Sequence, residues 1–241
     1  MPSSSITRRR FSMLATGAAL SVFVAACSDS GEASKVSQAQ DTPAVDPVTT
    51  ASVDLPPPSG DVDMEEVLKP GPMQEMAMGD PNAPVQIVEY MSMTCPHCAD
   101  FHNDTFKKIV ADYVDTGKVY FVVREFPFDP RATAAIMLAR CAPEDKFFPM
   151  IDVLMQQQAQ WARAQDAASA LFDISKLAGF TQESFEACLT NQSLVDDVNA
   201  VRKKAAEEFG VNSTPTFLIN GKRYPGNMSV ETMSALIDSL L

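Results

Sequence analysis

The stretch Met91-Ser92-Met93-Thr94-Cys95-Pro96-His97-Cys98 comes directly after the mostly apolar run of residues 85–91. Pro96 favours the start of a helix here, because the first helical residue needs no partner for its amide. Cys95 would then be the N-cap residue, and Cys98 would lie one turn into the helix on the same side. Unpaired amides and the positive end of the helix dipole favour a thiolate at Cys95. The stretch therefore predicts a strand followed by a helix that carries a reactive pair of thiols.

Apolar runs on both sides of this helix predict a βαβ unit. Residues 85–91 and 119–123 are nearly continuous apolar runs, which is typical of strands buried on both faces. Between them, apolar residues recur at helical spacing from Phe101 to Tyr113, and Gly117 is a helix-ending residue. A connecting helix makes the two strands parallel. The cysteines would then lie at the carboxyl end of the first strand, where open α/β sheets bind their ligands.

The remainder of the chain predicts a helical insertion and a return to the sheet. Residues 130–209 contain one helical pattern after another, and about eighty such residues are too many for a loop, so we expect a subdomain. Asn220-Gly221 lies between Thr216-Phe217-Leu218-Ile219 and Lys222-Arg223-Tyr224, and this dipeptide is a strong signal for a hairpin. Ser229 is expected to cap a final helix, and residues 73–79 are expected to form a short edge strand.

Cys95-Pro96-His97-Cys98, followed far downstream by Thr214-Pro215-Thr216, resembles the DsbA family of thioredoxin-fold oxidoreductases. The resemblance implies an α/β, thioredoxin-like fold with an inserted helical subdomain. Residues 73–129 and 210–241 would form the thioredoxin-like domain, and residues 130–209 the insertion. It also implies a thiol:disulfide oxidoreductase that introduces disulfides into exported proteins through a Cys95–Cys98 redox disulfide and a mixed-disulfide intermediate. No cofactor and no metal ion are expected.

The resemblance also assigns roles to residues around the two cysteines. Thr214-Pro215 resembles the family's cis-proline loop, which packs beside the dithiol and presents backbone to the substrate; an ordinary trans-proline turn is the alternative. Thr214 differs from the valine of the enteric enzyme and resembles the isomerase-like members, and its hydroxyl could hydrogen-bond a cysteine sulfur. His97, as an imidazolium, is expected to stabilise the Cys95 thiolate. The only other histidine, His102, is expected to be a partly exposed helix residue without a catalytic role.

Glu89 lies six residues before Cys95, at the position where the family carries a buried acid beneath the dithiol. Such a carboxyl group could carry protons to Cys98. The alternative is a solvated glutamate that faces the edge of the sheet. Lys118 is the basic partner that we expect for a buried Glu89.

The chain contains five cysteines, and three lie outside the redox pair. In an oxidising compartment, Cys141 and Cys188 are expected to form a structural disulfide, which would stabilise the fold by about 3–4 kcal/mol. Two isolated buried thiols are the alternative. Cys27 is left without a partner and follows Val24-Ala25-Ala26, so it resembles the lipidated cysteine of a bacterial lipoprotein. Ordinary signal cleavage after Ala26 is the alternative.

The amino-terminal third predicts export. Arg8, Arg9 and Arg10 precede the apolar run of residues 13–26, so residues 1–26 indicate an export signal of either the Tat or the Sec type. Residues 27–72 contain many prolines and, between 28 and 72, no aromatic residue, and they predict a disordered tether. We therefore expect a periplasmic protein that Cys27 could anchor to a membrane.

Composition restricts the partners. A net charge of −12 argues against nucleic acid and against binding to anionic lipid. The resemblance implies a DsbB-like membrane quinone reductase as reoxidant. Exported protein thiols are the expected substrates, and a monomer is the expected state. A reductase or an isomerase that uses the same cysteines is an alternative within this class.

Two further alternatives belong to other classes. One is a protein that binds or delivers Cu(I), because Met91 and Met93 precede the cysteines and Met73, Met76 and Met78 add further thioethers. Against this, the strand period would point Met91 and Met93 into the core. The other is a non-enzymatic lipoprotein that binds peptides in a groove around Pro215. A zinc site is a weaker hypothesis than a copper site, since the sequence has no second cysteine pair with the spacing of zinc ligands.

Overall fold

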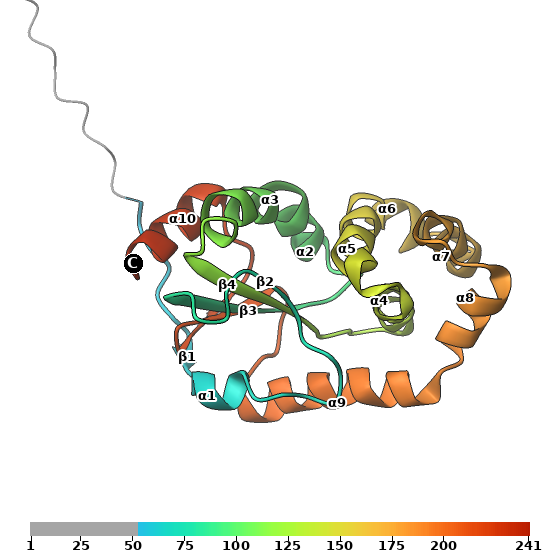
Figure 1. Ribbon diagram of the computed structural model, residues 1–241, viewed down its shortest axis with the longest axis horizontal. Coiled ribbons are helices and arrows are strands. Elements are labelled where there is room, and N and C mark those ends of the chain that lie inside the picture. Colours follow the sequence, from blue (N-terminus) through green and yellow to red (C-terminus); the bar gives the residue numbers. More distant parts are fainter. Residues whose placement is uncertain (1–52) are drawn as a thin grey trace, which may run out of the picture. The chain divides into compact units, whose positions relative to one another are not determined.

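The computed structural model describes residues 53–241, and its centre is a mixed sheet of six strands (Figure 1). The strands lie in the order β1-β6-β5-β3-β4-β2. Their bounds are β1 (Gly60–Asp61), β2 (Met76–Met78), β3 (Val85–Met91), β4 (Val119–Glu125), β5 (Thr216–Ile219) and β6 (Lys222–Pro225). The predicted α/β class is confirmed.

The βαβ unit forms as predicted. Strands β3 and β4 pair in parallel, from Val85 opposite Val119 to Met91 opposite Glu125. Strand β5 lies antiparallel on the other side of β3 and continues through a tight turn into β6. Asn220 and Gly221 form this turn with φ values of 43° and 86°, a conformation that asparagine and glycine adopt more readily than other residues. The central position of β3 places its carboxyl end, and the cysteines after it, in the middle of the sheet.

The helix that carries the cysteines is regular only in part. It consists of α2 (Pro96–Asp100), a π-helical turn η1 (Phe101–Thr105), α3 (Phe106–Ile109) and a second π-helical turn η2 (Val110–Val114). Gly117, with φ of 74°, follows its end as predicted. π-Helical turns are frequent near functional sites because they change the direction of the side chains around them.

Helices cover both faces of the sheet (Figure 1). On one face, Phe101, Phe121 and Phe217 lie in the larger apolar cluster, together with residues of α10 (Val230–Asp238). Ser229 caps α10 as predicted, because its hydroxyl oxygen accepts a hydrogen bond from the Thr232 backbone amide. The smaller cluster on the other face includes Val88 and is completed by α1 (Met64–Val67) and the end of α9 (Gln192–Glu208). The strand that leads to the cysteines is therefore buried on both sides.

The insertion is helical. Its elements are α4 (Pro130–Cys141), η3 (Glu144–Lys146), α5 (Phe147–Gln156), α6 (Gln158–Trp161), α7 (Ala167–Ser175), η4 (Lys176–Ala178), α8 (Gln182–Leu189) and the first part of α9. A disulfide joins Cys141 to Cys188, with 6.1 Å between the two Cα atoms, and so links α4 to α8. The subdomain shares the larger apolar cluster with the sheet, so it is fixed in place beside α2.

One predicted boundary is wrong. The predicted tether, residues 27–72, extends too far, because β1 pairs with β6 and Val67 of α1 is completely buried. These elements are too short for an apolar pattern in the sequence to reveal them. Burial, which local sequence does not show, decides this boundary. The last helix of the insertion, α9, ends at Glu208, and Ala205 and Phe209 at its end pack against the sheet residue Leu218 in the smaller cluster.

The predictions for residues 1–26 and for Cys27 lie outside the described residues. No helix among residues 53–241 is both long and apolar enough to cross a membrane.

Candidate active site

The backbone places the two cysteines as predicted. Cys95 is the N-cap residue of α2, in an extended conformation with φ of −77° and ψ of 119°, and Pro96 is the first helical residue. Cys95 is partly exposed and Cys98 is completely buried. Both are free thiols, so the structure represents the reduced form of the pair. Of the two sulfurs, only Cys95 is accessible to a reactant in solvent.

The two sulfurs differ strongly in acidity. The pKa of Cys95 is lowered to about 5, chiefly because the Cys98 side chain hydrogen-bonds its sulfur, and burial only partly opposes this. The Thr214 side chain and the backbone amides of Cys98 and His97 lower it further. Burial raises the pKa of Cys98 well above its ordinary value, and the hydrogen bond to Cys95 and the charge of Glu89 act in the same direction. At neutral pH the pair therefore consists of a Cys95 thiolate and a Cys98 thiol.

The loop before β5 lies against the reactive sulfur. The Thr214–Pro215 peptide bond is cis, as the resemblance implies. In the thiol form, Cys95 Sγ donates a hydrogen bond to the Thr214 carbonyl at 3.2 Å. Among the described residues, the buried Thr214 hydroxyl has no well-aligned hydrogen-bond partner, yet it acts on the pKa of Cys95. A small rotation would let this hydroxyl donate to the thiolate.

A buried acid–base pair lies beneath the dithiol. Glu89 is completely buried at the middle of β3, as the resemblance implies, and its Oε2 lies 3.0 Å from Nε2 of His102. The expectation of a partly exposed His102 is wrong, since its side chain is 2 % exposed. Lys118 is not the partner of Glu89, because its ammonium lies over the Tyr113 ring instead. The spacing of four residues from Cys98 to His102 places both side chains on the buried face of one helix. This spacing could have identified His102 as a buried residue near the dithiol.

His97 acts mainly through its backbone. Its side chain is 72 % exposed, and Nδ1 lies 3.9 Å from the Asp100 carboxylate. Its backbone amide, in contrast, is one of the groups that lower the pKa of Cys95. The helix start therefore contributes more directly to the thiolate than the imidazole does.

Gln158 of α6 connects the insertion to the redox loop, a contact that no pattern in the sequence indicates. Its side-chain amide is mostly buried and donates to the carbonyl oxygens of Met93 and Cys95, at 2.8 and 2.9 Å. Asp129 supports the same loop, because its Oδ2 accepts a hydrogen bond of 2.5 Å from the Thr94 hydroxyl. The insertion thus fixes the backbone on both sides of the reactive sulfur.

The methionines suggested as copper ligands are mostly part of the core. Met91 and Met93 are each 1 % exposed and belong to the larger apolar cluster, as their strand period predicts. Within residues 53–241, no group of three or more histidine, cysteine, aspartate or glutamate residues could hold a metal ion.

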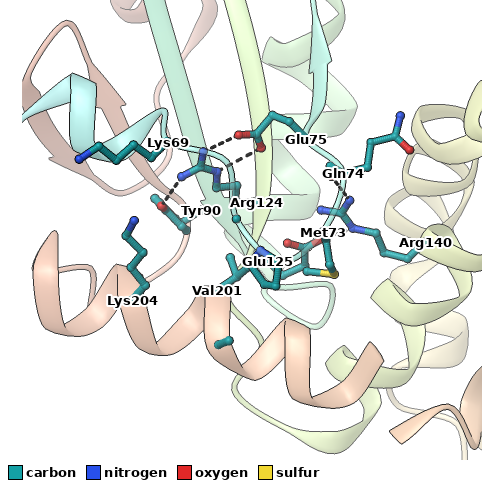
Figure 2. Close-up of a pocket in the computed structure, with 13 residues that line it drawn as sticks. Lys69, Met73, Gln74, Glu75, Tyr90, Arg124, Glu125, Arg140, Val201 and Lys204 are labelled. Carbon is teal, nitrogen blue, oxygen red and sulfur yellow. Dashed lines mark hydrogen bonds and ion pairs between the residues drawn. The ribbon is translucent and has the colours of Figure 1, made fainter. Parts of the chain in front are cut away.

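A cavity of about 50 Å³ lies on the face of the sheet that α9 covers (Figure 2). Arg124 pairs there with Glu75 and donates to the Tyr90 hydroxyl, while Arg140 binds Glu125 and the Gln74 carbonyl. None of the residues predicted for the redox site lines this cavity, although Met73, one of the suggested copper ligands, does. Its arginines hold the segment before β2, and we assign them a structural role.

Comparison with known families matches residues 72–239 to a family described as thioredoxin. A Rickettsia conorii protein, whose name assigns it to the protein-disulfide oxidoreductases, is 34% identical over 168 residues. That match covers 69% of this chain and 60% of the relative, so the chain spans less than two thirds of the length of the curated relatives it matches.

Solved structures agree with this fold. The crystal structure of Wolbachia pipientis alpha-DsbA1 superimposes with a TM-score of 0.68 at 29% identity, covering 74% of this chain and 96% of that one. Oxidised BdbD from Bacillus subtilis gives a TM-score of 0.62 at 20% identity, covering 76% of this chain and 97% of that one. The second likeness supports the fold alone.

Proposed function

The chain belongs to the thioredoxin family, as a DsbA-like member, and from this we propose that it is a thiol:disulfide oxidoreductase that introduces disulfides into exported proteins. The observation that carries the proposal is the difference between the two sulfurs. A partly exposed Cys95 has a pKa lowered to about 5, whereas the buried Cys98 has a raised pKa. A stable Cys95 thiolate stabilises the reduced pair, and a disulfide whose reduced form is stable is a strong oxidant.

The reaction starts from the Cys95–Cys98 disulfide. A substrate thiolate attacks the accessible Cys95 sulfur, a mixed disulfide forms, and Cys98 leaves as a thiolate. A second substrate thiolate then attacks the substrate sulfur of the mixed disulfide and expels Cys95. The substrate gains a disulfide, two electrons pass to the enzyme, and the reduced pair of the structure results. The low pKa of Cys95 makes it a good leaving group in the second step.

Cys98 needs a proton when it leaves, because its environment disfavours the thiolate. Glu89 is close enough for its charge to act on Cys98, and it is hydrogen-bonded to His102. We assign this pair the delivery of the proton to Cys98. Thr214 and the cis Pro215 complete the site by facing the Cys95 sulfur, where their backbone can pair with the substrate.

Equilibration with glutathione tests the direction of the reaction. If the protein is an oxidant, the reduction potential of the Cys95–Cys98 pair should lie near that of DsbA, roughly −120 mV. A potential near that of thioredoxin, roughly −270 mV, would contradict the oxidising role and leave a reductase. Cys95→Ser should abolish exchange altogether. If the Cys95→Ser variant still performs the protein's function in the cell although it cannot exchange disulfides, the non-enzymatic peptide-binding alternative holds instead.

The proposal also includes export to the periplasm, a lipid anchor and a partner that reoxidises the cysteines. The arginines and apolar run of residues 1–26 support export to the periplasm, and Cys27 supports a lipid anchor. An oxidant must be reoxidised after each turnover, and a DsbB-like membrane quinone reductase would serve this role. Mass spectrometry of the protein from a membrane fraction would detect a lipidated Cys27. A mature protein that begins at Cys27 with an unmodified thiol would contradict the anchor.

A further inference from the structure

An open groove of about 490 Å³ lies beside the redox motif, where the helical subdomain faces it. Thr94 and Pro96 form its wall next to Cys95, and residues around the start of α4 and the end of α6 form the rest. A side chain in this groove would therefore belong to a segment that reaches the reactive sulfur. None of the steps of the proposed reaction uses the groove.

Two arginines determine its charge. Arg131 lies in the first turn of α4 and Arg163 follows α6, and both are exposed. Neither guanidinium takes part in any ion pair found within residues 53–241. Arg131 donates one hydrogen bond, from Nη1 to the Ala162 carbonyl, and this contact ties it to the end of α6. Most donors of both side chains therefore remain available to a ligand.

The one acid in the lining, Asp129, is already engaged. Its Oδ1 accepts from the backbone amides of Arg131 and Ala132, at 2.9 and 3.0 Å. Its Oδ2 accepts from the Thr94 hydroxyl. Asp129 thus caps α4 and holds the loop before Cys95, and its carboxylate is not paired with either guanidinium. The groove is locally positive in a chain whose net charge is −12.

We propose that this groove is a subsite for an acidic side chain of the substrate, an aspartate or glutamate close in sequence to the cysteine being oxidised. The inference rests on the proposed oxidoreductase function and adds a substrate preference to it. A guanidinium can bind a carboxylate through two parallel hydrogen bonds, which fixes its orientation as well as its charge. The rest of this negatively charged protein repels an acidic segment of a substrate. The two arginines make the groove the favourable place for such a segment to bind.

Exchange kinetics with matched peptides test the subsite. The oxidised protein is mixed with single-cysteine peptides that carry Glu, Gln or Lys near the cysteine, on either side, and the rate of mixed-disulfide formation is measured. At low salt, we expect the best-placed Glu peptide to react about three to ten times faster than its Lys counterpart. The ratio should fall towards one at high salt, because the charges are exposed to solvent.

Substitutions of the two arginines test whether the preference for Glu peptides arises in the groove. Arg163→Glu should reverse the preference, and Arg131→Gln should reduce it. Lys203→Gln, which removes an exposed charge of α9, should leave the ratio unchanged. The ratio within each variant is the readout, since it cancels any general change in reactivity.

Three results would overturn the inference or its premise. Equal rates for Glu and Lys peptides in the unmodified protein would exclude the subsite while leaving the oxidoreductase function intact. A preference that survives both arginine substitutions would place acid recognition outside the groove. A lack of exchange with every peptide would instead contradict the proposed function itself.

Discussion

Cys95 and Cys98 are separated by only two residues, yet Cys95 is partly exposed and Cys98 is buried, and their pKa values shift in opposite directions. Cys95 is held at the surface by the helix start and faces amides and the Thr214 side chain, whereas Cys98 is enclosed in the core above a buried acid. The hydrogen bond between the two sulfurs couples their pKa values, and each further neighbour adds a contribution of its own, so substituting such a neighbour should shift the pKa on which it acts in a defined direction.

Removing the Thr214 hydroxyl should raise the pKa of Cys95. Thr214→Val keeps the shape of the side chain but deletes a group that lowers this pKa. The thiolate absorbance of the reduced protein, followed against pH, measures the shift. Thr105→Val is the matched control, because its buried hydroxyl donates to the Met228 carbonyl instead. An unchanged Cys95 titration in Thr214→Val would exclude this contribution.

Neutralising Glu89 should lower the pKa of Cys98, because the carboxylate charge is one cause of its elevation. Glu89→Gln should also slow the step in which Cys98 leaves, if the carboxyl group delivers the proton. Stopped-flow measurement of mixed-disulfide formation at several pH values separates the two effects. A rate and pH profile identical to those of the unmodified protein would contradict the assigned proton delivery.

His102→Leu should destabilise the protein by about 1–3 kcal/mol, because it leaves the buried Glu89 carboxylate without its hydrogen-bond partner. Urea unfolding of the reduced protein measures the change. In the double variant with Glu89→Leu, the loss should be partly recovered, since no unpaired carboxylate remains. Additive losses in the double variant would show that the two side chains do not interact.

At the scale of elements, the segment before β2 is joined to the rest by ionic contacts as well as by β1. Glu75→Ala should cost about 1–3 kcal/mol of stability, because the mostly buried Arg124 loses its carboxylate (Figure 2). Glu66→Ala is the control: it breaks the exposed pair with Lys69 and should change stability by less than about 0.5 kcal/mol. Equal effects of the two variants would contradict the structural role of Glu75.

The helical subdomain is connected internally by the bond between α4 and α8. Replacing Cys141 and Cys188 by alanine should lower the free energy of unfolding by about 3–4 kcal/mol. The thiolate titration of Cys95 should not change, because the bond contributes nothing to the causes of its pKa. A shifted titration would show that the subdomain controls the redox site through this bond.

The sequence predicted elements wherever a long pattern or a special turn residue marked them. The strands around the cysteines, the Asn220-Gly221 turn and the cap at Ser229 are of this kind. It missed features that depend on distant partners. Strand β1 has two residues and exists only because β6 offers a free edge, and Gln158 reaches the redox loop from another helix. Residue spacing alone cannot reveal such contacts.

At the scale of the whole molecule, the low Cys95 pKa links stability to pH. The folded pKa of about 5 lies below the ordinary value of 9.0, so the unfolded reduced chain binds one proton more between these limits. The stability of the reduced form should therefore rise from pH 5 to 9 and lose this contribution as pH falls through 5. The oxidised form lacks this titration, so unfolding of both forms across this range measures the difference. If the stabilities of the reduced and oxidised forms changed with pH in the same way, this linkage between the Cys95 pKa and stability would be contradicted.

The central claim is that the fold holds Cys95 as a thiolate, and titration of the reduced protein tests it most directly. The ultraviolet absorbance of the thiolate should rise with a midpoint at about pH 5, and alkylation at neutral pH should label Cys95 and leave Cys98 unmodified. A midpoint near 9.0, the ordinary value for a cysteine, would contradict the account.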